Sequence, residues 1–140
     1  MGALALAALA FTTVGAAGQD VPAAAVEVKE ILSTTVTAGG QPLVLPTGTV
    51  RLIASTYVIP KAAALPVHKH PFARYAYVLA GRLTVTDAEN GREFTYGVGD
   101  VVVELIGRWH SGRNTGNEPV RLLVIDQVPD GEKSTILRAP

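Results

Sequence analysis

Histidine occurs only three times in this chain, at positions 68, 70 and 110. A single lysine separates His68 from His70, so on a β-strand both imidazoles project from the same face. A neutral imidazole offers one nitrogen lone pair, and three that converge on one point suit a divalent transition metal. We therefore expect His68, His70 and His110 to form a metal site.

The elements that must position these histidines are short β-strands. For His110 to meet the other two, the sheet that carries them has to curl round on itself. Runs with β-strand character occupy 50–59, 65–70, 74–80, 82–87, 92–96, 101–106 and 120–128, with a further strand around Trp109 and His110. Glycine, proline and an Asn-Gly pair separate the runs, and Asn-Gly is a strong hairpin signal. This punctuation predicts an all-β antiparallel sandwich or barrel.

Composition and charge limit the function classes. The 140 residues are 48% hydrophobic and 17% charged, which is enough for one domain with a proper core. Twelve basic and twelve acidic side chains cancel, so we expect no binding to nucleic acid. The chain contains no cysteine, which excludes a thiolate nucleophile, a thiolate ligand and a disulfide.

The first residues, MGALALAALAFTTVGAAG, carry no charged side chain and end in small residues. This pattern predicts a secretory leader over 1–18, cleaved after Ala16, Ala17 or Gly18, and hence a periplasmic or secreted protein. The apolar run is too short to span a bilayer, and we expect no membrane contact beyond the leader. A basic residue near Met1 is missing, so an Ala-rich extension and an uncleaved anchor stay open, as does a longer basic end before Met1.

The remaining chain divides into three parts. We expect an N-terminal extension over 19–49 with an edge strand over 31–37, a barrel over 50–128, and a loosely packed tail over 129–140. The polar stretch 111–118 is predicted to be a loop between two strands of the barrel.

Together, the two histidine segments resemble the cupin superfamily, whose small barrels are marked by two motifs. The first motif (G, five residues, H-x-H, three or four residues, E, six residues, G) falls on Ala62, His68, His70, Arg74 and Gly81, and the second (G, five residues, P-x-G, two residues, H, three residues, N) on Gly99, Leu105, Gly107, His110 and Asn114. Three of five positions match in the first motif and four of five in the second. Each motif alone is weakly specific, but their joint register over 62–114 is specific.

The resemblance implies a single-domain antiparallel jelly-roll barrel of the cupin type. It implies that His68, His70 and His110 bind a divalent transition metal, either Fe, Mn, Ni, Cu or Zn. The alternative is a metal-free barrel whose histidines hydrogen-bond one another in the core. The resemblance also implies a homodimer, because cupins commonly pair through sheet edges and exposed edges need covering.

Arg74 stands where metal-binding cupins have a glutamate ligand. One resolution is that Arg74 swings aside to pair with a carboxylate, for which Glu104 is the best candidate because it interrupts the apolar run VVVELI. A second is that Arg74 faces the cavity and grips an anionic ligand. A third is that no metal binds. A register slip by one residue would instead place Tyr75 in the glutamate position.

These residues predict an exported protein that binds a divalent metal and acts on a small organic molecule as an oxygenase, isomerase or decarboxylase. Arg74, Glu104 and Trp109 are the candidate substrate-binding residues, Trp109 because it could wall the pocket mouth beside His110. No catalytic residue is assigned. The alternative is a non-catalytic protein that binds or senses a small molecule, with or without metal.

Overall fold

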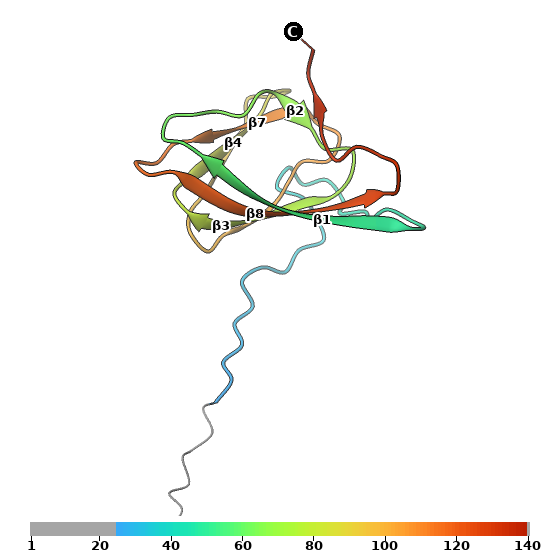
Figure 1. The fold of residues 1–140 in the computed structure, drawn as a ribbon, viewed down its shortest axis with the longest axis horizontal. Helices are drawn as coiled ribbons and strands as arrows, with labels where there is room; N and C mark the ends of the chain where they lie inside the picture. The colour runs from blue at the N-terminus through green and yellow to red at the C-terminus, as the bar shows by residue number, and fades with distance from the viewer. Residues whose placement is uncertain (1–24, 140) are drawn as a thin grey trace, which may run out of the picture.

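Two antiparallel sheets lie one over the other across the core of the computed structural model, which describes residues 25–139 (Figure 1). The strand order is β1-β8-β3-β6 in the first sheet and β5-β4-β7-β2-β9 in the second. The strands are β1 (Val50–Ile59), β2 (His68–Lys69), β3 (Arg74–Ala80), β4 (Leu83–Asp87), β5 (Glu93–Tyr96), β6 (Val101–Val103), β7 (His110–Asn114), β8 (Val120–Pro129) and β9 (Ile136–Leu137). The fold is the all-β antiparallel jelly-roll barrel that the sequence predicted.

The strand β8 illustrates why these residues form a two-sheet fold. Every second side chain of β8 is buried, and the residues between them are exposed or half-buried, which is the period-two pattern of a strand with one face on the core. The buried hydrophobic cluster comprises Ile59, Ala76, Val78, Leu83, Val85, Val102, Val120, Leu122 and Val124. Its members come from both sheets, so the same apolar contacts that hold the strands together also close the barrel.

The edge strand predicted over 31–37 is wrong. In its place the chain makes a single bridge between Val36 and Pro42 and folds back against the barrel. The turn between them packs tightly, because a Cβ on Gly39 would lie 2.5 Å from a methyl of Leu105. The β-branched residues of this segment therefore pair with their own neighbours instead of extending a sheet.

Two further boundaries differ from the predictions. The strand β7 continues to Asn114, so the first half of the predicted loop 111–118 is part of the second sheet. Most residues of the tail are exposed, but it is tied to the second sheet, because β9 pairs with β2 and the amide of Arg138 donates to the carbonyl of Val67 at 3.0 Å. The outer edge of β2 has backbone groups that need hydrogen-bond partners, and the tail supplies them.

The predicted leader, 1–18, lies outside the described residues. Within 25–139, no helix is long and apolar enough to cross a membrane.

Candidate metal centre

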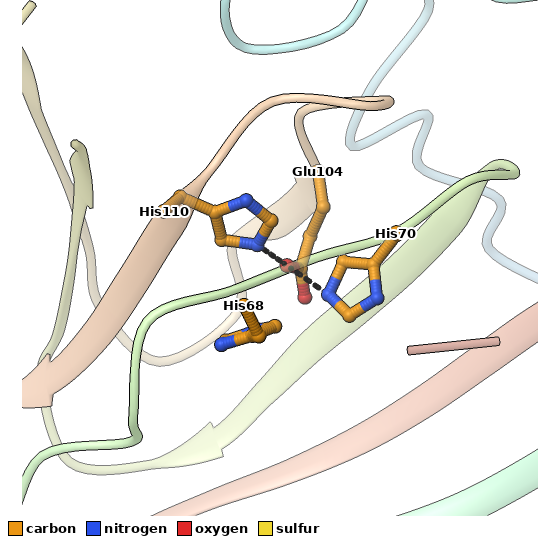
Figure 2. A group of neighbouring side chains, drawn as sticks. All are labelled: His68, His70, Glu104 and His110. Carbon is orange, nitrogen blue, oxygen red and sulfur yellow. Dashed lines mark hydrogen bonds and ion pairs between the residues drawn. The ribbon is translucent and has the colours of Figure 1, made fainter. Parts of the chain in front are cut away.

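Four side chains converge inside the barrel: His68, His70, Glu104 and His110 (Figure 2). Their potential ligand atoms all lie within 4.8 Å of one another. The three histidines are buried, and the side chain of Glu104 is 13% exposed. The sequence predicted that the histidines would meet, and the structure brings them together. It adds Glu104, which was predicted from the sequence to pair with Arg74 or to bind a substrate.

Strand pairing explains how segments far apart in sequence meet here. His68 and His110 are direct partners across the antiparallel β2 and β7. His70 forms a bridge with Ile106, and the amide of Gly107 donates to the carbonyl of His70 at 2.7 Å. Gly107 has a φ of 70°, in the left-handed region where glycine is favoured. This turn joins the segment after β6, which carries Glu104, to β7.

Each imidazole is oriented by a backbone carbonyl. The Nδ1 atoms of His68, His70 and His110 lie 2.7, 2.9 and 2.9 Å from the carbonyl oxygens of Pro66, Ser134 and Arg108, respectively. A carbonyl oxygen only accepts hydrogen bonds, so each Nδ1 carries a hydrogen. The neutral ring then has its lone pair on Nε2. All three histidines are therefore held in the tautomer that can ligate a metal through Nε2.

The three imidazole nitrogens and the carboxylate together suit a bound cation. One carboxylate oxygen of Glu104, Oε2, lies 3.1 Å from Nε2 of His110 and 3.2 Å from Nε2 of His70 (Figure 2). The Nε2 atom of His70 is buried and has no partner with acceptable hydrogen-bond geometry. Lone pairs on nitrogen that face a carboxylate oxygen repel it unless a proton or a metal ion lies between them. Three imidazoles and one carboxylate fit a divalent transition metal.

The protonation of the cluster favours ligation at neutral pH. Burial, partly offset by the Pro66 carbonyl, lowers the pKa of His68 to about 4, so its lone pair stays available. Burial alone would raise the pKa of Glu104, but the contacts with the His110 and His70 rings outweigh it and hold that pKa well below its usual range. The carboxylate is thus ionised.

Arg74 points into the barrel, but it does not pair with Glu104 as predicted. Its guanidinium binds the carboxylate of Asp126 on β8, with Nε to Oδ1 at 2.7 Å and a terminal nitrogen to Oδ2 at 3.0 Å. The same terminal nitrogen donates to the hydroxyl of Thr135 at 3.0 Å. The prediction that Arg74 swings aside to pair with a carboxylate was thus right. The carboxylate is that of Asp126 and not that of Glu104.

Sequence reasoning missed three residues that contact Arg74 or His70. Asp126 is a charge at an inward position of β8, and the alternation of that strand could have revealed it. Ser134 and Thr135 lie in the tail, where no sequence signal pointed to the site. The predicted slip that would put Tyr75 in the glutamate position does not occur, because Arg74 is buried and Tyr75 is half-buried on the other side of β3.

Trp109 lies away from the cluster. The alternation of the chain turns its ring to the side opposite His110, where Nζ of Lys69 lies 4.6 Å and the guanidinium carbon of Arg138 lies 6.0 Å from the centre of the indole. Lys69 points outward, as predicted. Trp109 is also not among the residues that line the cavity beside the cluster.

A small cavity adjoins the four side chains. Its volume is about 20 Å³, and its walls include His68, Glu104, Arg74 and Tyr57 together with apolar residues of both sheets. A space of this size holds about one water molecule. The barrel interior therefore accommodates an ion and a water beside the cluster more readily than a larger molecule.

Comparisons with known proteins agree with this architecture. The family model described as "Cupin domain" matches residues 54–126. The chain is similar to the solved structure of BH2720 from Bacillus halodurans, with a TM-score of 0.52 and 24% identity over 59% of this chain and 67% of that one. It is similar to the cupin domain of Schizosaccharomyces pombe Cnp3, with a TM-score of 0.51 and 25% identity over 56% of each chain.

A third similar structure is the DMSP lyase DddQ from Ruegeria pomeroyi. The TM-score is 0.52 and the identity 28%, over 61% of this chain and 42% of the lyase. The chain thus spans less than half of the lyase. A search of curated protein sequences gave no match.

Proposed function

Because this chain belongs to the cupin superfamily, we propose that it binds a divalent transition metal through His68, His70, His110 and Glu104. One observation carries the proposal: three carbonyls accept the Nδ1 hydrogens, which leaves a lone pair on each Nε2, and the Nε2 atoms of His70 and His110 lie 3.2 and 3.1 Å from one carboxylate oxygen of Glu104. A metal-free core of hydrogen-bonded histidines would need hydrogens on Nε2 or other hydrogen-bond donors, and this tautomer does not provide them.

Glu104 takes over the role of the missing motif glutamate. The amide of Glu104 donates to the carbonyl of Arg74 at 3.0 Å, and the next residues, Tyr75 and Val103, are partners in β3 and β6. The two positions therefore lie side by side on adjacent strands. A carboxylate on the neighbouring strand reaches the same histidines, while the arginine at the motif position turns to Asp126. The set of three nitrogens and one oxygen is compatible with Fe, Mn, Ni, Cu and Zn.

The proposed activity is a reaction of a small organic molecule at this metal. A bound divalent ion would supply Lewis-acid chemistry at positions that the protein leaves open. The residues of the chain would orient the ligands, exclude bulk water and, through the Glu104 carboxylate, lower the net charge of the centre. The DMSP lyase at 28% identity supports a small organic substrate, but it does not choose among oxygenation, isomerisation and decarboxylation.

A non-catalytic metal-binding protein is the second candidate. The cavity of about 20 Å³ favours it, since organic ligands usually occupy pockets of about 300–1,000 Å³. The version in which Arg74 grips an anionic metabolite loses support, because Asp126 and Thr135 already accept its hydrogen bonds. Export to the periplasm or beyond stays a prediction from the N-terminal residues.

Metal analysis of the untagged protein tests the proposal. Protein purified without added metal is expected to contain about one equivalent of a transition metal or to bind one of Fe(II), Mn(II), Ni(II), Cu(II) and Zn(II) in calorimetric titration. The variant His68→Ala, His110→Ala should lose this binding while it keeps the β-rich circular dichroism spectrum. If the wild type binds none of the five metals, or the double variant binds as the wild type does, the proposal is wrong. With metal bound, turnover of small carboxylates and of DMSP separates the two candidates.

A further inference from the structure

The candidate carboxylate ligand lies on backbone that belongs to no strand. His68 and His110 lie in β2 and β7, where they are register partners. Glu104 instead follows the end of β6 at Val103, and its amide donates to the carbonyl of Arg74 at 3.0 Å. The position of its carboxylate therefore depends on what holds the residues on either side of it.

A turn of the N-terminal extension covers the outer edge of β6. This turn, residues 37–41, is called the strap below. The amide of Ala38 donates to the carbonyl of Val103 at 2.9 Å, and Gly39 lies against the buried side chain of Leu105. Because β6 is an edge strand of its sheet, its outward backbone groups need partners, and the strap supplies one. The strap thus reaches the site from outside the segment that the family model matches.

The side chain of Gln41 pairs with Ile106 as the backbone of a neighbouring strand would. Its Nε2 donates to the carbonyl of Ile106 at 2.6 Å, and its Oε1 accepts from the amide of Ile106 at 3.1 Å. A carboxamide can do this because, like a peptide group, it offers both donor and acceptor. His70 is the bridge partner of Ile106. The segment that follows Glu104 is therefore held between the strap and a candidate metal ligand.

The carboxamide of Gln41 is itself held in place by Thr37, which is 3% exposed. The Thr37 hydroxyl donates to Oε1 of Gln41 at 3.3 Å and accepts from the amide of Gln41 at 3.2 Å. The amide of Thr37 donates to the carbonyl of Gln41 at 2.8 Å. The carbonyl of Ile106 needs a donor and its amide needs an acceptor, so only one orientation of the carboxamide fits. Gln41 is thus arranged for this contact before it meets Ile106.

We propose that Gln41 is a positioning residue of the metal centre, which through the backbone of Ile106 holds the segment that carries Glu104. The inference rests on the proposed function, because it concerns Glu104 as a metal ligand. Ligands of a binding site have to stay within about 0.5 Å of their productive positions. Without the two hydrogen bonds from Gln41 the segment would move more freely, and the carboxylate would bind the metal less well while the three histidines keep their places.

The variant Gln41→Met tests the proposal, because it keeps the length of the side chain and removes both hydrogen bonds. The amide of Ile106 loses its acceptor and should exchange faster with deuterium in the metal-free protein. In calorimetric titration the affinity for Zn(II) should fall by about 10–100-fold, as on loss of other orienting partners. The matched control is Gln127→Met, the same change at a half-buried position of β8 where Oε1 has no hydrogen-bond partner. It should bind Zn(II) as the wild type does.

The visible spectrum of the Co(II)-loaded protein separates positioning from a general loss of stability. At saturating Co(II), the spectrum of Gln41→Met should shift toward that of Glu104→Gln, because both variants weaken the same ligand. A variant that only lowers the unfolding free energy would keep the wild-type spectrum. For the same reason, Gln41→Met combined with Glu104→Gln should bind Zn(II) about as weakly as Glu104→Gln alone.

Different results would overturn the proposed function and this inference. A wild type that binds none of the five metals would overturn both. If the wild type binds and Gln41→Met exchanges faster at Ile106 but keeps the Zn(II) affinity of Gln127→Met, only the positioning role is wrong. It is also wrong if the losses of the two single variants multiply in the combined one. Should Gln41→Met fail to fold, Gln41→Glu takes its place with the same expected loss, because it keeps the acceptor for the Ile106 amide and lacks the donor to the carbonyl.

Discussion

Arg74 and Asp126 form a buried bidentate pair across β3 and β8, where they are direct register partners. The arginine and the aspartate are 5% and 3% exposed. The pair neutralises a cation that would otherwise lie beside the histidines, and through Thr135 it also holds the tail of the chain. A departure from the family motif is thus compensated on a neighbouring strand.

Removing one partner of this pair should be costly. In Asp126→Asn the Arg74 charge stays buried without its carboxylate, and such losses cost about 3–5 kcal/mol in unfolding free energy. The freed guanidinium would also compete with metal for Glu104, so metal affinity should fall as well. Urea unfolding and calorimetric titration with Zn(II) measure the two effects.

The control for that variant is Asp130→Asn, which makes the same chemical change at an exposed position. It should leave the unfolding free energy and the metal affinity unchanged. A stability for Asp126→Asn equal to that of Asp130→Asn would contradict the role given to the pair.

The tail should position a ligand without touching the metal. A chain that ends at Lys133 lacks the Ser134 carbonyl, which accepts from Nδ1 of His70, and the strand β9. Loss of such an orienting partner typically weakens metal binding by about 10–100-fold. Nitrogen NMR of the His70 ring should show a mixture of tautomers in place of one. A chain that ends at Arg138 is the control, and equal affinities for the two truncated chains would argue against this role.

The fold and the histidines were predictable because they depend on local signals. Runs with β-strand character and the glycine and proline residues that bound them predicted β1 and β3 with their observed bounds, and the H-x-H spacing placed two imidazoles on one side of the chain. The histidine cluster then followed from closure of the barrel. Local patterns of this kind survive in the folded protein because each agrees with the global arrangement.

The rest of the site depends on pairings that lie far apart in sequence. Glu104 joins the histidines because β3 pairs with β6. Arg74 meets Asp126 because β3 pairs with β8. Ser134 reaches His70 only because the tail adds a strand beside β2. A single sequence contains no register information for these contacts, so the sequence identified Arg74 and Glu104 but paired them with each other and missed Asp126.

Two glycines with the same backbone conformation should respond differently to alanine. Gly81 and Gly91 have φ values of 78° and 74°. Gly91→Ala adds a methyl in open space and should cost only the left-handed penalty of about 1–2 kcal/mol. In Gly81→Ala the new Cβ would lie 2.8 Å from the backbone of Pro119 and Val120, which cannot easily move. Urea unfolding should rank Gly81→Ala as clearly less stable, and equal values would count against the close packing at this turn.

Acid should destabilise the metal-free protein in a window set by His68. Its pKa is about 4 in the folded state against about 6.5 when exposed, so between these values the unfolded chain binds a proton that the folded chain does not. The unfolding free energy should therefore fall as the pH drops from about 6.5 toward 4, by up to about 1.4 kcal/mol per pH unit from this group. Above about 6.5 the group contributes no pH dependence.

His68→Gln provides the comparison for this effect. The variant cannot titrate, so its unfolding free energy should change less steeply over the same window, and the difference between the two proteins isolates His68. Glu104 affects the unfolding free energy only at lower pH, because its depressed pKa keeps the carboxylate of the folded protein ionised below the usual range of a carboxyl group. Identical pH profiles for the wild type and His68→Gln would show that this histidine is not held neutral by burial.

Glu104→Gln is the most direct test of the relocated carboxylate. The amide has the shape of the acid but lacks its charge and is a poor metal ligand, so the variant leaves three histidines and Arg74 in place. Loss of a direct anionic ligand should exceed the roughly 10–100-fold effect typical of orienting partners, and we expect Zn(II) affinity to fall by more than about 100-fold. Glu93→Gln, an exposed position on β5, is the matched control and should bind as the wild type does. If Glu104→Gln keeps full affinity while His68→Ala, His110→Ala loses it, the metal is held by the histidines alone, and Glu104 is not a ligand.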